Sequence, residues 1–321
     1  LAARCGVQYG IGVDNATHAA TLALRALGIG SGDEVITTPL TAVPTISAIA
    51  ATGAKPVFVD VEADTVLLDV TRVEAVITSR TRAIVPVHLY GQCVAMQPLL
   101  AIAQRHELSI VEDCAQCMDA SQNGQKAGSF GKLATFSFYP TKPLGAFGDG
   151  GMIMTSDPAL NARLRRLRYY GMERTYYAEE QGYNARLDEV QAAILLVRLA
   201  RLDEENQHRQ ALAHRYRQNL TGHPVQVLTV KPGNEHVYHQ FVIRHPERDR
   251  LQKELAEQGI GTGVHYPWPV HTMRGYQYLG YQVGDFPQAE AAAREVLSLP
   301  LYPSLTLEQV DQICQALVGS L

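Results

Sequence analysis

Short apolar, β-rich runs alternate with segments of helical periodicity through the first 170 residues of this 321-residue chain. The expected strands are residues 56–60, 83–87, 109–112, 135–138 and 151–155. The expected helices are residues 43–51, 70–78, 97–106 and 158–170. This alternation predicts an α/β fold, with a mostly parallel sheet flanked by helices on both faces.

The pattern changes in the second half of the chain. A helical pattern from residue 187 to about 219 predicts one long helix, or two helices with a bend. Beyond Pro224 the elements become shorter, with strands near 225–230 and 237–243 and helices near 248–258, 288–297 and 307–318. A chain of this length exceeds the usual size of one domain. We therefore predict a large α/β domain over residues 1–205 and a small C-terminal α+β domain over residues 206–321.

Charge and hydropathy narrow the classes of function. The net charge is −4 and the pI is near 6.3, and basic residues are dispersed except for the run 163–168. A nucleic-acid partner is therefore not expected. No apolar stretch reaches the ~18 residues that a membrane span needs, and no signal-peptide pattern opens the chain, so we predict a cytoplasmic protein without a membrane partner.

The five cysteines are an odd number, which argues against a disulfide framework. Cys114 and Cys117 form a CxxC pair, which is compatible with a redox motif or half of a zinc site. Zinc needs a second pair of ligands, and the neighbouring sequence offers none, so no metal site is expected.

Lys142 is the strongest candidate for chemistry. It ends the segment Ser137-Phe138-Tyr139-Pro140-Thr141-Lys142, just before a glycine-rich run at 145–151. A lysine that forms an imine with an aldehyde cofactor must be partly desolvated, and a nearby hydroxyl group and backbone N–H groups suit the cofactor's phosphate. The alternative interpretation is a solvated surface lysine after a turn.

Other candidates lie at element ends, where ligands of such sheets bind. Asp113 follows an expected strand, placed to pair with a protonated ring nitrogen, and Gln116 lies three residues further on. Asn15-Ala16-Thr17 begins a helical pattern whose free N–H groups suit a phosphate. Asp113 and Thr17 are equally compatible with simple helix caps.

With these residues together, the chain resembles the DegT/DnrJ/StrS aminotransferases, the sugar-nucleotide branch of the fold-type I pyridoxal phosphate enzymes. The resemblance covers essentially the whole chain. It is carried by eight segments in the family's order, namely residues 15–17, 30–35, 53–60, 86–92, 112–116, 137–142, 182–193 and 265–271.

The resemblance implies a role for each candidate near the cofactor ring. Lys142 would form the imine with pyridoxal 5'-phosphate and then shuttle a proton at the amino-bearing carbon. Asp113 would keep the ring nitrogen protonated. Gln116 would contact the hydroxyl side of the ring.

The resemblance also implies how the phosphate and the substrate are held. Ser137, Thr17 and the backbone at Ala16 would bind the phosphate, and Asn184 would reach it from the neighbouring subunit of a homodimer. The residues expected on the substrate side are Tyr183, His265 and His271.

The implied reaction is a transamination through a pyridoxamine 5'-phosphate intermediate. L-glutamate would donate its amino group to a keto group of a nucleotide-linked deoxysugar, with a dTDP-linked 3-keto-6-deoxyhexose expected and a 4-keto sugar as the alternative. A non-catalytic protein of the same fold that binds or senses pyridoxal phosphate is a further alternative. A lysine-independent dehydratase carries histidine at the imine position, and Lys142 argues against it.

Three features depart from the family pattern. Ala16 replaces a common glycine but still supplies its N–H group. Ala42 stands where an aromatic residue usually stacks on the cofactor ring. The chain opens in what corresponds to the middle of a family helix, so by analogy a segment of roughly 40 residues is expected before Leu1.

Overall fold

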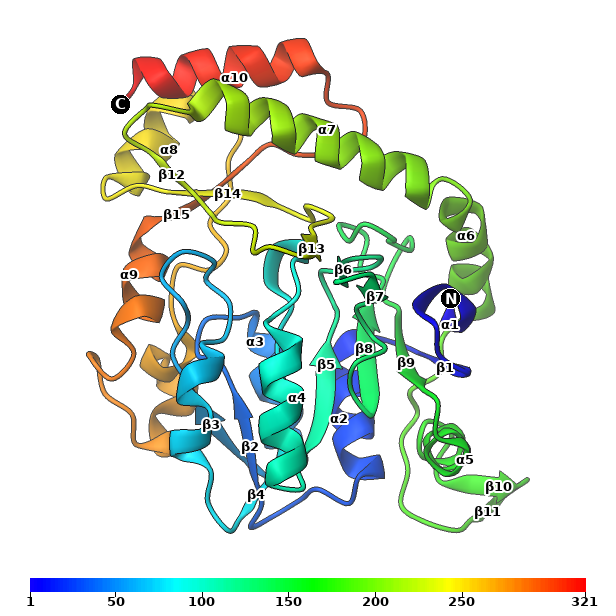
Figure 1. The fold of residues 1–321 in the computed structure, drawn as a ribbon. Coiled ribbons are helices and arrows are strands. Elements are labelled where there is room, and N and C mark those ends of the chain that lie inside the picture. The colour runs from blue at the N-terminus through cyan, green and yellow to red at the C-terminus, as the bar shows by residue number, and fades with distance from the viewer.

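A seven-stranded sheet forms the centre of the protein (Figure 1), which we describe from a computed structural model of residues 1–321. The strand order is β1-β9-β8-β5-β4-β2-β3. β8, β5, β4, β2 and β3 are parallel, whereas β9 runs antiparallel to β8 and to β1. The strands are β1 (Tyr9–Val13), β2 (Glu34–Thr37), β3 (Lys55–Phe58), β4 (Thr81–Ile84), β5 (Ser109–Asp113), β8 (Leu133–Ser137) and β9 (Gly151–Thr155). The predicted mostly parallel sheet is confirmed.

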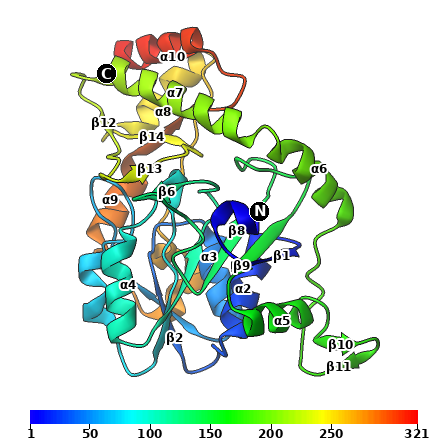
Figure 2. The same cartoon turned by 45° about the vertical axis from the view of Figure 1, so that its right-hand side comes forward.

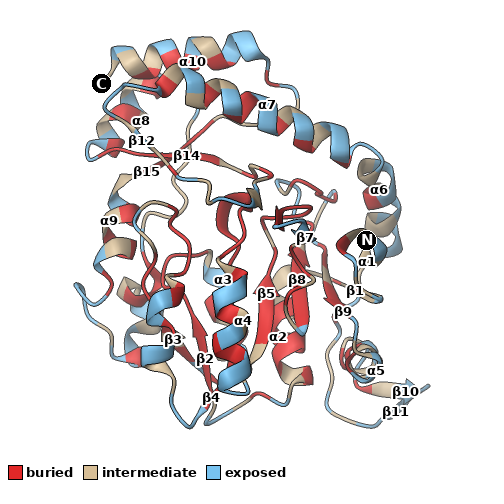
Figure 3. Cartoon of the chain, viewed as in Figure 1, coloured by how far each residue is buried: buried red, intermediate tan, exposed pale blue.

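Neighbouring residues of each strand face opposite sides of the sheet, as the two-residue period requires. In β5, Ile110 belongs to one buried cluster with Leu99 of α4, whereas Val111 belongs to a second cluster with Leu22 of α2. Helices therefore cover both faces of the sheet, as the rotated view in Figure 2 shows, and the strands between them are the most deeply buried part of the chain (Figure 3). The helices of this part are α1 (Ala2–Cys5), α2 (Ala16–Ala26), α3 (Val43–Ala51), α4 (Met96–Arg105) and α5 (Pro158–Leu167).

The expected long helix after residue 187 is two helices, α6 (Glu189–Leu199) and α7 (Leu202–Leu220). α7 packs beside α10 (Leu307–Gly319), above a three-stranded antiparallel sheet (Figure 1). That sheet consists of β12 (Gln226–Val227), β14 (Phe241–Arg244) and β15 (Val296–Leu299), and α8 (Arg248–Glu257) and α9 (Pro287–Glu295) adjoin it. A third buried cluster, drawn from residues 212–317, joins α7, α8, α10, β14 and β15, whereas the buried alanines of α9 belong to the first cluster, which includes Ile110. The domain boundary at 205/206 stays a prediction.

Short ribbons complete the structure. β6 (Ser121–Gln122) pairs with β7 (Gln125–Lys126) and with β13 (Asn234–Glu235), and β10 (Met172–Arg174) pairs with β11 (Tyr177–Ala178). None of the helices is both long and apolar enough to span a bilayer.

Three predicted elements are wrong in detail. Residues 70–78 form two short 3-10 turns rather than a helix, where β-branched residues disfavour a regular helix. The strand expected at 237–243 begins only at Phe241, because Tyr238 has a φ of 48° and residues 237–240 dock on the loop at Tyr90 instead. The helix expected at 288–297 ends at Glu295, and the next residues pair with β14 as β15. β1 and β2 were not predicted from the sequence.

Candidate active site

One cavity of about 260 Å³ lies at the carboxyl ends of β5 and β8, at the N-terminus of α2. Ligands of open α/β sheets bind at this edge because the strand ends diverge there. Six of the predicted site residues line the cavity, namely Ala16, Thr17, Asp113, Gln116, Ser137 and Lys142.

One end of the cavity suits a phosphate. Asn15 caps α2 by accepting a hydrogen bond from the His18 N–H at 2.8 Å, so the first-turn N–H groups of Ala16 and Thr17 have no partner within the helix. β9 begins against this helix end, where a Cβ on Gly151 would lie 2.6 Å from the Asn15 carbonyl carbon. Ser137 pairs with Gly151 across β8 and β9, which brings its hydroxyl group to the same place. A helix N-terminus with a neighbouring hydroxyl group favours an anion.

Asp113 is held from two sides. It is the last residue of β5, its side chain is buried, and Thr45 Oγ1 donates to Asp113 Oδ2 at 2.8 Å. The Ala115 N–H donates to Asp113 Oδ1 at 3.1 Å. These bonds fix the carboxyl group so that it faces the cavity. Thr45 was missed in the sequence analysis, since it lies one turn into α3 and 68 residues away.

Lys142 lies in a tight turn after β8. Its N–H donates to the Tyr139 carbonyl at 2.8 Å, and Gly145 packs so closely against Pro140 that a Cβ would lie 2.5 Å from the Pro140 oxygen. The side chain is partly buried, and burial lowers the pKa of its amine, while the Asp113 carboxylate opposes that shift. A lowered pKa leaves more of the neutral, nucleophilic amine near neutral pH than a solvated lysine has, so the geometry fits an imine-forming lysine better than a surface side chain.

A second buried network lies directly behind Asp113. Glu112 is fully buried and accepts four hydrogen bonds, from His88 Nε2 at 3.0 Å and from the N–H groups of Gly128, Phe130 and Gly131 at 2.7–2.9 Å. His88 Nδ1 accepts from the Val94 N–H at 3.1 Å. Glu112, His88 and Cys114 are close enough to share a metal ion, but the histidine and the carboxyl group already use their lone pairs within the protein.

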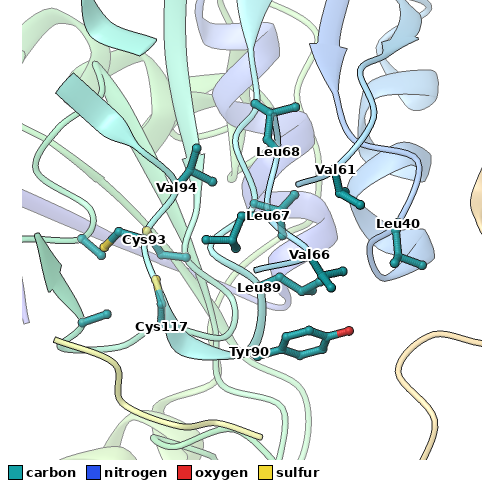
Figure 4. Close-up of a cluster of buried hydrophobic side chains, with 14 of the residues drawn as sticks. Leu40, Val61, Val66, Leu67, Leu68, Leu89, Tyr90, Cys93, Val94 and Cys117 are labelled. Carbon is teal, nitrogen blue, oxygen red and sulfur yellow. The ribbon is translucent and has the colours of Figure 1, made fainter. Parts of the chain in front are cut away.

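The CxxC pair has no surface access. Cys114 and Cys117 are buried, and burial raises the pKa of both thiols. Cys93 and Cys117 lie in the apolar cluster that Figure 4 shows. Buried thiols of raised pKa are poor nucleophiles, so the geometry does not support the redox interpretation.

Four predicted residues do not line the cavity. His265 lies on the Lys142 side, where burial and then the lysine charge lower its pKa, and its Nδ1 is 2.9 Å from Ser298 Oγ. Tyr183 faces His18, with ring centroids 6.3 Å apart, and Asn184 bridges to Tyr169. His271 is buried, with its Nε2 3.0 Å from Glu290 Oε1, so its predicted contact with substrate does not fit the structure.

The face of the cavity at Ala42 has no aromatic wall. Small side chains line it, including Ala42, Pro44 and Ala115, and the one aromatic residue in the lining is Tyr139, which is half exposed. The stacking aromatic that the family pattern supplies is therefore replaced by small apolar contacts.

The sheet and the lysine-centred cavity define the class of this protein as a pyridoxal phosphate aminotransferase of fold type I. Comparison with known proteins then identifies the family. The DegT/DnrJ/EryC1/StrS aminotransferase family model matches residues 1–318, so the chain belongs to that family. The predicted resemblance is confirmed. Members of this family use pyridoxal phosphate, which is the cofactor of this chain.

Similar proteins cover almost the whole chain. The dTDP-3-amino-3,4,6-trideoxy-alpha-D-glucose transaminase of Micromonospora megalomicea subsp. nigra is 49% identical over 97% of this chain and 85% of its own length. The pleiotropic regulatory protein of Geobacillus stearothermophilus is 47% identical, over 98% of this chain and 86% of its own length. The structure of S. venezuelae DesV with a ketimine intermediate has a TM-score of 0.97 and 46% identity, over 99% of this chain and 86% of DesV.

Proposed function

We propose that this protein transfers the amino group of L-glutamate to the 3-keto group of a dTDP-linked 6-deoxyhexose. One observation carries the proposal: a desolvated Lys142 and a buried, hydrogen-bonded Asp113 share a cavity whose far end suits a phosphate. The choice of sugar is supported by the similarity to transaminases that act on dTDP-3-amino sugars.

The residues present fit pyridoxal phosphate. The N–H groups of Ala16 and Thr17 and the hydroxyl group of Ser137 would hold the phosphate, and Asp113 would hold the proton on the ring nitrogen. When bound, the cofactor supplies an electron sink for the carbon that bears the amino group.

Lys142 Nζ is the atom of this chain that would take part directly in the reaction. Its lowered pKa makes the neutral amine available for bonding to an aldehyde carbon, and the same atom then accepts and returns a proton at the reacting carbon. The turn at Gly145 keeps the lysine close to the end of β8.

We infer that the complete site needs a second copy of the chain. Tyr183 and Asn184 lie outside their own cavity, and the partner's copies of these residues would complete it. α6 carries an exposed apolar face suited to a homodimer contact, with Val190, Leu196 and Val197 each more than 60% exposed. Stable contacts between copies bury such faces.

The test follows the absorbance of the protein with bound pyridoxal phosphate. L-glutamate alone should convert the lysine-linked band to the pyridoxamine band, and a panel of 3-keto and 4-keto nucleotide sugars should restore it, with the 3-keto sugars faster. No conversion would favour the alternative of a sensing protein, which the similarity to a pleiotropic regulatory protein keeps in view. Faster restoration by 4-keto sugars would refute the keto position.

A further inference from the structure

Gln116 has a fixed orientation in the cavity wall. Its Oε1 accepts a hydrogen bond from the Tyr90 N–H at 2.7 Å, and this bond determines the positions of the amide oxygen and nitrogen. Its Nε2 therefore points the other way and donates to the hydroxyl group of Tyr266 at 3.1 Å. A residue 150 positions away in the chain is thereby joined to the cavity wall.

The segment around Tyr266 is anchored on two sides. Gly263 exchanges two backbone hydrogen bonds with Ser298, at 3.0 and 2.7 Å, and the Tyr90 hydroxyl group donates to the His265 carbonyl. Tyr90 is buried and has a φ of 61°, a left-handed conformation that a bulky residue adopts only when its surroundings hold it. In Figure 4 its hydroxyl oxygen points away from Cys93 and Cys117.

The Tyr266 hydroxyl group keeps an unused proton. It accepts from Gln116 but donates to no group of the protein, although the side chain is mostly buried. Burial raises the pKa of Tyr266 to about 12, so the group stays protonated at neutral pH. A buried hydroxyl group usually finds an acceptor. Tyr266 does not itself line the empty cavity but contacts Gln116, which does, so a molecule bound against Gln116 is the acceptor that this site can offer.

The covalent structure of pyridoxal phosphate indicates which oxygen that is. If the phosphate lies at the start of α2, the ring nitrogen at Asp113 and the aldehyde carbon at Lys142, the hydroxyl-bearing edge of the ring faces the remaining wall, at Gln116. We propose that Tyr266 is a further cofactor-binding residue, whose hydroxyl group donates to this ring oxygen while Gln116 holds it in place. The inference rests on the proposed function.

The donated hydrogen bond should be measurable in the bound cofactor itself. The ring oxygen also attracts the proton on the lysine-linked nitrogen, and it attracts that proton more strongly once another donor is lost. Tyr266→Phe should therefore raise, by about one pH unit, the midpoint of the absorbance titration of the bound cofactor. This is the size expected for one hydrogen bond to a charged acceptor. Tyr90→Phe, which loosens the His265 backbone only, should give a smaller shift of the same sign.

Tyr281→Phe is the matched control. Its hydroxyl group accepts from the Phe58 N–H at 3.2 Å, and Phe58, unlike the Tyr266 partner Gln116, does not line the cavity, so removal of this hydroxyl group should leave the absorbance titration unchanged. If the Tyr266→Phe protein binds the cofactor and titrates like the parent and like Tyr281→Phe, the role of Tyr266 is overturned, whereas the proposed function is not affected. If the parent protein itself gives no lysine-linked absorbance with pyridoxal phosphate, the proposed function fails, and this inference fails with it.

Discussion

Replacing Glu112 by glutamine should destabilise the protein although it changes one atom. All four partners of Glu112 are donors: the Phe130 and Gly131 N–H groups reach Oε1, and His88 Nε2 and the Gly128 N–H reach Oε2. A glutamine accepts at one oxygen only, and its amide N–H groups would face the other two donors. His88 cannot compensate by moving its proton, because its Nδ1 already accepts from Val94.

The magnitude follows from the two donors that lose their acceptor. Each buried unsatisfied group costs about 1–3 kcal/mol, so the variant should lose roughly 2–6 kcal/mol of unfolding free energy. That is a large share of the roughly 5–15 kcal/mol that a folded protein has. Because Asp113 follows directly in β5, the variant should also bind pyridoxal phosphate more weakly.

Thermal unfolding measured by circular dichroism, with and without cofactor, tests this reasoning. The unfolding midpoint should fall by at least about 3 °C. Glu74→Gln is the control, since Glu74 is half exposed and solvent screens its pairs with Arg105 and His106, so they should contribute little to stability. A Glu112→Gln midpoint within 1–2 °C of the control, at roughly equal helix content, would refute the argument that the acceptor is irreplaceable.

Three further predictions concern the site and the dimer. Lys142→Ala should abolish turnover and the lysine-linked absorbance. In the parent protein, borohydride trapping of pyridoxal phosphate near pH 8 should label Lys142 ahead of the exposed Lys253, because burial lowers the pKa of Lys142 and frees its amine at lower pH. Preferential labelling of Lys253, read by mass spectrometry, would contradict this prediction. Asn184→Ala should weaken cofactor binding. If sites are shared between copies, refolding the Asn184→Ala protein together with the Lys142→Ala protein should restore roughly a quarter of the parental activity. No recovery of activity in the refolded mixture would argue for sites within one copy. Leu196→Glu should shift sedimentation toward a monomer, because it places a charge on the exposed face of α6. Val283→Glu changes a similarly exposed residue outside that face and should not shift sedimentation. A Leu196→Glu protein that sediments like the parent would exclude this face as the contact.

The sequence predicted the parts of the site that depend on local order. Asp113 and Lys142 could be placed because one ends a buried strand and the other follows a buried strand, and the carboxyl ends of parallel strands lie at one edge of the sheet. Thr45 and Tyr266 could not, because they contact Asp113 and Gln116 across 68 and 150 residues. Periodicity carries no information about such distant pairs.

The wrong elements have the same cause. The helix expected to continue to residue 297 has adequate local propensity, yet Val296–Leu299 pairs with β14, because a buried apolar run gains more in the sheet of the C-terminal half. His271 was assigned to the substrate from its place in a segment, but the fold turns it inward toward Glu290. Tertiary contacts decided both outcomes.

The face of the cavity at Ala42 carries no aromatic residue, and this affects how the cavity can hold its cofactor. An aromatic stacking partner contributes about 0.5–1.5 kcal/mol beyond the area that it buries, and Ala42 forgoes that contribution. Binding must then depend on the ends and edges of the ring, at the start of α2, at Asp113 and at Gln116. Two of these contacts also depend on residues behind the cavity wall, because Glu112 precedes Asp113 in β5 and the Tyr90 N–H fixes Gln116, so substitutions at Glu112 and Tyr90 should be felt in the bound cofactor.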